Sequence, residues 1–409
     1  MTMTSSETMA DAGIGATQLP APTRRSPRRL RHILRLDDFE PAARRHLPRP
    51  LFSYVSGGVE DNVSRSDNRA AFLEWGFLPR VLVGVANRTQ SVELLGRTYA
   101  HPFGIGPMGI SAMTAYRGDL VFARCAHAAN IPMVLSGSSL IRLEEIVAEA
   151  KDAWFQAYLP GELAQIDALV DRAARAGYKT LMLTVDTPAN PNKEHNLRAG
   201  FTSPLRPGPR LAWDGLVRPR WLFGTFLRTL ARHGMPHFEN SYATRGVAIL
   251  SRDVARDFSD RGSLVWGHVE HIRKRWAGGL VIKGIMHPDD GRIAREHGVD
   301  AVIVSNHGGR QLDGAVSPLR VLPEVVEACK DMPVIVDGGI RRGTDVLKAL
   351  ALGARFVFVA RPFNYAAAIA GEAGVAHAIR LLASEIDRNM AMLGVNRLDE
   401  LGPQYLRRL

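Results

Sequence analysis

The chain has 409 residues, 46% of them hydrophobic, and a formal net charge of +11. This length suffices for one large barrel domain with additions or for two medium domains, and the composition is ordinary for a globular protein. The two cysteines, Cys125 and Cys329, belong to no C-x-x-C pair and have no His/Cys ligand set near them in the sequence. We therefore expect neither a disulfide framework nor a metal site, and a reducing, cytoplasmic compartment fits best.

Two segments carry much of the excess positive charge. Residues 1–35 contain six arginines and two carboxylates, so we expect a disordered Arg-rich tail there, although this composition also suits an organellar transit peptide. An insertion at about 200–262 holds a second arginine cluster, interleaved with Trp213, Trp221, Phe223 and Phe226. This mixture suits an anionic membrane surface at least as well as nucleic acid, and we expect no nucleic-acid partner.

Apolar runs in this chain are short. None reaches 18 residues, so no transmembrane helix is predicted. We expect a cytoplasmic protein, with peripheral attachment to the inner face of the cell membrane as the alternative.

Eight short apolar runs follow one another from residue 102 onward. They predict strands at 103–106, 133–135, 155–158, 180–185, 280–283, 301–305, 333–336 and 356–359. Helical patterns at 163–176, 265–276, 288–297 and 344–352 lie between several of them. Eight βα repeats with buried strands predict a (β/α)8 TIM barrel over residues 36–409, interrupted by the insertion after strand four. A doubly wound sheet is the alternative, but no G-x-G-x-x-G follows the first strand.

Polar residues follow strands four to seven, where a barrel carries its reactive groups. Strand four is followed by Asp186, strand five ends in Lys283, and strand six leads into His307 and Arg310. A neutral imidazole can accept a proton, and a guanidinium can hold a carboxylate in a fixed orientation. The pair therefore predicts an organic acid as the substrate.

Small residues and arginines follow strands seven and eight. Asp337-Gly338-Gly339 precedes Arg341, and Ala360-Arg361 follows the last strand. Glycines let backbone N–H groups approach an anion, and guanidinium groups bind phosphate strongly. The two motifs together predict a phosphate site, although Gly-Gly-x-Arg alone is equally compatible with a tight turn.

The run from Ser305 to Asp313 reads S-N-H-G-G-R-Q-L-D. It resembles the active-site signature of the FMN-dependent L-2-hydroxy-acid oxidases and dehydrogenases, which act on substrates such as glycolate, L-lactate and mandelate. The resemblance spans about residues 36–370. It implies FMN as cofactor, a homotetramer, and oxidation of an L-2-hydroxy acid, lactate-like or larger and aromatic, to the 2-oxo acid.

The resemblance also implies substrate-binding and catalytic residues. His307 corresponds to the base and Asp186 to the carboxylate that orients it, whereas Tyr54, Tyr158 and Arg310 correspond to substrate contacts. Lys193 stands where the family has a second carboxylate-binding Arg, and lysine keeps the charge but loses the planar fork. Hydride transfer and a carbanion route both remain compatible with this set.

The resemblance also implies the FMN contacts. The turn Pro107, Met108 and Gly109 would lie at flavin N5, with Met108 in place of the usual Thr, and Lys283 would lie near flavin N1 and O2. Further contacts are Ser136, Gln156, Thr184 and Ser305, and those around the phosphate are Asp337, Gly338, Gly339, Arg341, Ala360 and Arg361.

Quinone and oxygen are the two alternatives for the electron acceptor. The segment 216–233, with Trp221, Leu222, Phe223, Phe226, Leu227 and Leu230 among arginines, resembles the insertion of membrane-associated relatives that reduce quinone. A lid or a subunit contact in a soluble, oxygen-using oxidase that forms hydrogen peroxide is the alternative. A redox-silent phosphate-binding barrel and a non-catalytic membrane-binding paralogue are the competing functions of other classes.

Overall fold

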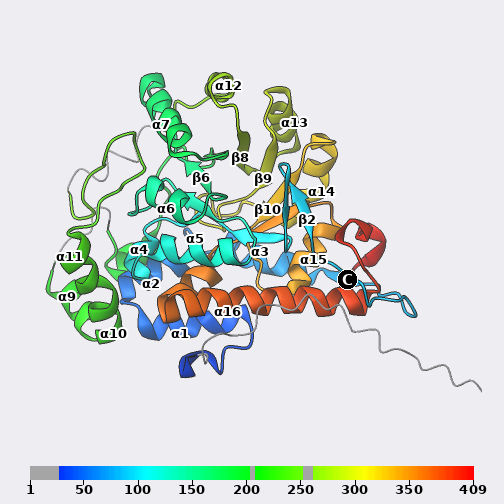
Figure 1. Ribbon diagram of the computed structural model, residues 1–409, viewed down its shortest axis with the longest axis horizontal. Helices are drawn as coiled ribbons and strands as arrows, with labels where there is room; N and C mark the ends of the chain where they lie inside the picture. The colour runs from blue at the N-terminus through cyan, green and yellow to red at the C-terminus, as the bar shows by residue number, and fades with distance from the viewer. Residues whose placement is uncertain (1–26, 203–207, 252–260) are drawn as a thin grey trace, which may run out of the picture.

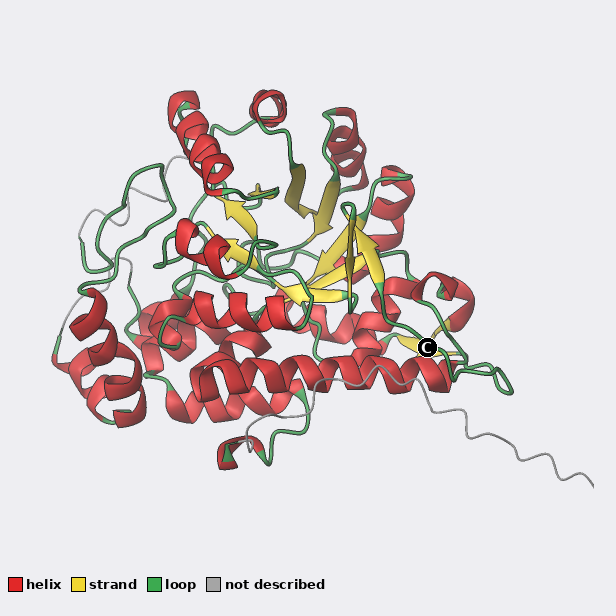
Figure 2. Cartoon of the chain, in the orientation of Figure 1, coloured by secondary structure: helices red, strands yellow, loops and turns green. Residues whose placement is uncertain are grey.

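The computed structural model describes residues 27–202, 208–251 and 261–409. Its centre is a sheet of eight parallel strands in the order β4-β11-β10-β9-β8-β7-β6-β5, surrounded by helices (Figures 1 and 2). A parallel bridge between Ile105 and Met133 joins the two ends of this order, so the sheet closes into a barrel. The strands are β4 (Phe103–Ile105), β5 (Val134–Ser136), β6 (Trp154–Ala157), β7 (Thr180–Thr184), β8 (Gly279–Ile285), β9 (Ala301–Val304), β10 (Val334–Asp337) and β11 (Phe356–Val359).

All eight predicted strands are present, and their ends differ from the predicted ones by at most two residues. The closed barrel confirms the predicted fold and excludes the doubly wound sheet. The register between β8 and β9 shifts between Lys283 and Ile285. Such a bulge re-aims side chains beside a site.

Alternating strand residues fill two separate cores. Ala301 and Ile303 belong to the cluster inside the barrel, whereas Val302 and Val304 belong to the cluster under the helices. The antiparallel pair β2 (Val92–Leu94) and β3 (Arg97–Tyr99) contributes buried residues to the inner cluster. The barrel interior is therefore packed, as in other barrels of eight strands.

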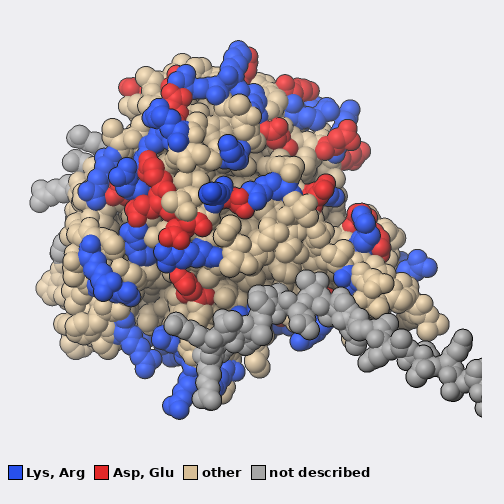
Figure 3. Space-filling model, in the orientation of Figure 1, with Lys and Arg blue, Asp and Glu red and all other residues tan. Residues whose placement is uncertain are grey.

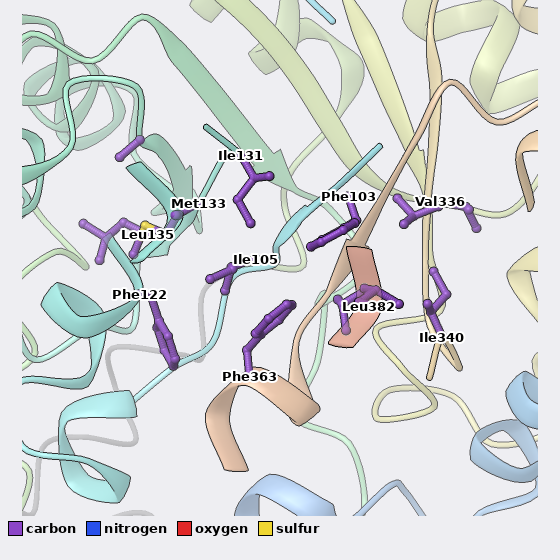
Figure 4. Close-up of a cluster of buried hydrophobic side chains, with 14 of the residues drawn as sticks. Phe103, Ile105, Phe122, Ile131, Met133, Leu135, Val336, Ile340, Phe363 and Leu382 are labelled. Atoms are coloured by element: carbon purple, nitrogen blue, oxygen red, sulfur yellow. The ribbon is translucent and has the colours of Figure 1, made fainter. Parts of the chain in front are cut away.

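Eight helices cover the outside of the barrel. They are α5 (Gly118–Ala128), α6 (Leu143–Glu149), α7 (Leu163–Ala176), α12 (Trp266–Arg275), α13 (Pro288–Glu296), α14 (Pro318–Cys329), α15 (Gly343–Ala351) and α16 (Arg361–Leu393). In Figure 4, Phe122, Phe363 and Leu382 from these helices lie against strand residues such as Phe103 and Ile105.

Helix α16 is the one described helix with the length and hydropathy of a membrane span. It is interrupted at Ala370 and Gly371, whose backbone angles are not helical, and it packs on α1 (Phe39–His46), α5 and α15. Its apolar residues are largely buried, so α16 serves as a core helix.

The ordered part of the chain begins nearer the N-terminus than the composition predicts. The expected tail ends at residue 35, but Leu30 and Ile33 are 2% and 5% exposed, and the backbone carbonyl of Ile33 lies 2.8 Å from Nε2 of His377 on α16. The boundary at 35 is therefore too late, because two apolar residues anchor the chain to α16. Residues 1–26 of the expected tail lie outside the described residues.

Further elements precede the barrel and close the chain. They are η1 (Arg28–Leu30), η2 (Leu36–Asp38), α2 (Arg49–Ser56), α3 (Val63–Leu73), β1 (Trp75–Phe77), η5 (Leu398–Glu400), η6 (Pro403–Tyr405) and β12 (Leu406–Arg408), which pairs with β1. The short helix α4 (Ser111–Thr114) lies between β4 and α5.

The described part of the insertion is largely helical. It follows α8 (Glu194–Ala199) and contains α9 (Pro209–Leu216), α10 (Pro219–Trp221), the π-helical segment η3 (Leu222–Leu227) and α11 (Arg228–His233). Figure 1 shows α9, α10 and α11 together at one side of the barrel, next to α2 and α4. Trp221 is buried, whereas Phe223 and Leu227 are exposed, so only part of this apolar set faces outward.

Candidate active site

A pocket opens at the carboxyl ends of the barrel strands. It is lined by Tyr54, Val55, Gly106, Pro107, Met108, Gly109, Ser138, Tyr158, Thr184, Lys283, His307, Gly308, Arg310, Asp337, Gly338, Gly339, Ile340, Arg341, Phe358, Val359, Ala360, Arg361 and Asn364. Most of the sequence-predicted residues thus surround one space. Asp186, Ser136, Gln156 and Ser305 lie behind this lining, and Lys193 lies in a neighbouring cavity.

His307 lies in a left-handed turn after β9. Its φ is 56°, and Gly308 and Gly309 follow at 69° and 71°. A side chain on Gly309 would place its Cβ 2.5 Å from the backbone nitrogen of Arg65, so this turn needs glycine there. A non-glycine residue in this conformation is strained, and such residues are concentrated at functional sites.

His307 and Asp186 form a partly buried pair. Nδ1 of His307 lies 3.0 Å from Oδ1 of Asp186. An ionised carboxylate can only accept, so Nδ1 carries the proton and Nε2 is left with a lone pair. Burial lowers the pKa of His307 below its usual value, while Asp186 opposes this shift. Burial alone would raise the pKa of Asp186, but His307 and Lys283 hold it below its usual value. The imidazole is therefore neutral and the carboxylate charged at neutral pH.

Lys283 is fixed beneath the pocket. Its ammonium group donates a hydrogen bond of 2.8 Å to the Ser305 hydroxyl and lies 3.4 Å from Oδ2 of Asp337. The same Ser305 hydroxyl accepts the backbone N–H of His307 at 3.0 Å. Ser305 thus acts from behind the lining, by connecting the lysine to the turn that carries His307.

The loop after β10 brings two glycines against α3. Gly338 and Gly339 have φ of 101° and 78°, and a Cβ on Gly339 would lie 1.8 Å from the carbonyl oxygen of Asn68. The side chain of Arg341 is buried beside them, with Nε 3.3 Å from Asp37 Oδ1. Burial lowers the pKa of the Arg341 guanidinium. An anion in this loop would compensate the cost of burying that charge.

Arg310 and Arg361 share acceptors at the end of α2. Arg310 donates to the carbonyls of Val55 at 3.3 Å and Gly57 at 2.8 Å, and Arg361 donates to the same two carbonyls at 3.1 Å each. Burial, followed by the nearby charge of Arg310, lowers the pKa of Arg361 to about 9. Within the described residues no carboxylate pairs with either guanidinium. Neither positive charge is neutralised by these contacts, so each can attract an anionic ligand.

A second cavity of ≈470 Å³ adjoins the first and shares Tyr54, Tyr158, His307 and Arg310 with it. Lys193 lines this cavity, where burial, followed by the charge of Arg310, lowers its pKa to about 7. The cavity therefore combines the proton acceptor, a guanidinium and an amine whose charge depends on pH.

Several buried polar atoms around the pocket lack a hydrogen-bond partner. They include Gln156 Nε2, Thr184 Oγ1, Asp337 Oδ1 and Asn364 Oδ1. Ser136 donates at 3.2 Å to Oε1 of Gln156, which orients that amide. Buried polar groups are normally satisfied, so these atoms point to a polar ligand.

Sequence reasoning missed several residues in or beside the two cavities, including Ser138, Asn364 and His195. Ser138 lines both cavities, Asn364 lines the first, and His195 packs against Gly57, where a Cβ would lie 1.7 Å from its Nε2. Asn364 follows Arg361 by three residues on α16, a helical spacing that could have indicated it. His195 offers no such signal, because its place depends on the contact between α8 and α2.

Comparisons with known proteins agree with this site. The family model described as FMN-dependent dehydrogenase matches residues 43–408. The chain is 36% identical over 383 residues to (S)-mandelate dehydrogenase of Pseudomonas putida, covering 92% of this chain and 94% of that protein. It is 36% identical over 376 residues to L-lactate dehydrogenase of Yersinia pestis, covering 90% and 97%.

Solved structures show the same likeness. The crystal structure of the monotopic membrane protein (S)-mandelate dehydrogenase superposes with a TM-score of 0.87 at 35% identity, covering 92% of this chain and 100% of that one. A mandelate oxidase variant superposes with a TM-score of 0.76 at 32% identity, covering 91% and 98%.

The residues present fit FMN. The buried cation of Arg341 and the partly buried one of Arg361 suit its phosphate, and the amide nitrogen of Gln156 and the hydroxyl of Thr184, which have no partner among the described residues, suit the polar edge of its ring system. Lys283 supplies a fixed charge beside them. The chain belongs to the FMN-dependent dehydrogenase family and is an FMN-dependent alpha-hydroxy-acid dehydrogenase or oxidase rather than a redox-silent barrel.

Proposed function

We propose that this enzyme oxidises an L-2-hydroxy acid to the 2-oxo acid with His307 as the base. The observation that carries this proposal is the His307–Asp186 pair, which leaves Nε2 free at the mouth of both cavities. A base that is aligned in this way contributes about 10²- to 10⁴-fold to the rate. Turnover of L-2-hydroxy acids but not their D-enantiomers, with a 2-oxo acid as product, tests the proposal.

The protein's own groups divide the work. The guanidinium of Arg310, the hydroxyl of Tyr54 and the amine of Lys193 bind the substrate carboxylate, and Tyr158 lines the same cavity. Nε2 of His307 takes the proton, and Asp186 stabilises the imidazolium that forms. Lys283 provides positive charge beneath the pocket, where negative charge develops. FMN, when bound, supplies the two-electron acceptor that the side chains lack.

We infer that the substrate is larger than glycolate, either lactate-like or aromatic. The cavity of ≈470 Å³ is lined on one side by Leu197, Phe201, Phe238 and Ile249. Such side chains favour an apolar substituent. Comparison of kcat/KM for L-lactate and (S)-mandelate tests this size class, and a preference for glycolate would contradict it.

We propose that a quinone is the electron acceptor and that the insertion attaches the enzyme to the inner face of the cell membrane. Trp213, Leu216 and Phe223 are 66%, 61% and 66% exposed on α9 and η3. Figure 3 shows arginines and lysines over the same side of the molecule. Apolar side chains among cations can enter the headgroup region of anionic lipid. The solved relative described as a monotopic membrane protein adds support.

The test replaces Trp213, Leu216 and Phe223 together by serine. This variant preserves buried Trp221, which a deletion of 216–233 would remove along with its hydrogen bond to the carbonyl of Met113. We expect loss of vesicle binding with unchanged dye reduction. Full solubility of the parent protein together with rapid oxygen reduction would instead favour the soluble oxidase. Light scattering on the detergent-solubilised protein tests the tetramer that we also propose.

A further inference from the structure

An apolar cavity of ≈250 Å³ lies between the inserted helices and the start of α2. Its walls include Leu51, Met113, Leu211, Trp221, Phe226 and Ile249. Ile249 also lines the substrate cavity, so the two spaces are neighbours. The lining is almost wholly apolar and opens to solvent at Ala212, so an apolar chain can enter this space from outside the protein.

Trp221 gives the cavity a rigid wall. Its indole Nε1 donates a hydrogen bond of 2.7 Å to the carbonyl of Met113, and its ring stacks on Phe226 with centroids 5.5 Å apart. Helix α9 contributes the small residues Ala212 and Gly215 to the lining, and Gly215 lies beside the Trp221 ring. The space is therefore bounded by an anchored aromatic ring and by small side chains that leave room beside it.

Helix α9 is apolar on two faces. Leu211 and Gly215 line the cavity, while Trp213 and Leu216 on the same helix are 66% and 61% exposed. The charged residues Arg210 and Asp214 lie on the remaining part of this short helix, so exposed apolar side chains stand beside charged ones, as in helices that lie in a membrane interface. The helix that lines the cavity is thus also the one that would contact the apolar phase of a bilayer.

Cations gather next to the cavity. Arg218 donates from Nε to the carbonyl of Leu47 at 3.3 Å, one residue before Pro48 in the cavity wall. Burial, and then Arg29, Arg220 and Arg218, lower the pKa of His46 to about 4. The nearby carboxylate of Asp214 lies 3.7 Å from Arg49. The charge beside the cavity is therefore positive, which complements an anionic headgroup.

We propose that this cavity holds one acyl chain of an anionic phospholipid, whose phosphate is bound by Arg218 and Arg220. The inference rests on the membrane attachment proposed above and names the lipid class that would occupy a defined site. One bound chain would fix the insertion at a set depth, with the substrate cavity beyond Ile249.

The experiment measures binding of lysophosphatidylglycerol of increasing chain length, below its critical micelle concentration, to the delipidated, FMN-loaded full chain by native mass spectrometry. Each buried methylene should raise affinity about fourfold until the cavity is filled. Gly215→Leu should abolish this chain-length dependence, because a Cβ there would meet Trp221 at 3.6 Å and further atoms would occupy the cavity. Gly224→Leu is the matched control, because nothing lies within 4 Å of its Cβ position.

Further measurements distinguish an anionic lipid from other ligands of the cavity. Arg218→Gln with Arg220→Gln should weaken the phosphatidylglycerol lipid more than lysophosphatidylcholine, because the choline cation of the second lipid already offsets the charge of its phosphate. Equal affinity for the two lipids in the parent protein, or unaltered binding by Gly215→Leu, would overturn the proposal. Tighter binding of an uncharged isoprenoid quinone analogue would also overturn it. The serine variant of Trp213, Leu216 and Phe223 should keep the single lipid while losing vesicles, which separates this site from membrane attachment in general.

Discussion

Replacing Asp186 by Asn should slow catalysis without removing FMN. The carboxylate lies 3.0 Å from Nδ1 of His307. At that distance and an effective dielectric constant of about 20, a full imidazolium charge and the carboxylate attract by ~5 kcal/mol. Solvation and the hydrogen bond that Asn retains reduce the loss to ~3 kcal/mol. Because about 1.36 kcal/mol corresponds to tenfold in rate, kcat should fall about 10²-fold.

The assay is steady-state dye reduction combined with rapid-mixing absorbance of bound FMN. The loss should appear in kcat and in the rate of FMN reduction, with KM nearly unchanged, because the imidazolium forms only as the proton moves. Asp167→Asn is the matched control, since Asp167 pairs with His271 at 2.7 Å outside the site. A loss of less than about fivefold, or a loss confined to KM, would refute this role of Asp186.

Four further outcomes are expected. His307→Gln should keep FMN bound while retaining less than about a tenth of kcat, measured with a dye acceptor. In the parent enzyme, kcat/KM should fall only at pH below the usual histidine range, because burial lowers the pKa of His307 and its neutral form is the base. Burial lowers the pKa of Lys193 to about 7, so this amine loses its charge as pH rises through that value. KM should therefore rise above pH 7 in the parent enzyme, whereas the KM of Lys193→Arg should not change with pH. Parallel pH profiles of KM would contradict this. Arg341→Ala with Arg361→Ala should yield colourless protein whose dialysed form shows no flavin absorbance, since two buried phosphate donors are lost; full FMN occupancy would sink the assignment. Gly109→Ala should raise KM, because the new Cβ would lie 2.9 Å from the Tyr54 hydroxyl and 3.1 Å from Ser138 Cβ, and an unchanged KM would show that Tyr54 does not bind the carboxylate.

Local patterns were sufficient for the barrel and for the polar residues that follow its strands, whereas the family resemblance implied the remaining site residues. Parallel strands that are buried on both faces are continuous apolar runs, so β4 to β11 could be located within two residues. Carboxyl ends of barrel strands converge, so the polar residues that follow them could be assigned to one pocket before any coordinates. The glycines after His307 could be placed because a left-handed turn requires them.

Contacts between distant segments required the tertiary structure. The sequence does not show that Leu30 and Ile33 are buried near α16, because two apolar residues in an arginine-rich stretch have no periodicity. Likewise, Arg310 and Arg361 share the carbonyls of α2 across more than 250 residues of chain. In the sequence Trp221 cannot be told apart from the exposed aromatic residues near it. The structure shows that it is held in the lining of the apolar cavity by its hydrogen bond to the carbonyl of Met113. Sequence determined which chemistry this protein carries, whereas long-range packing decided which charges are buried and which apolar side chains face outward.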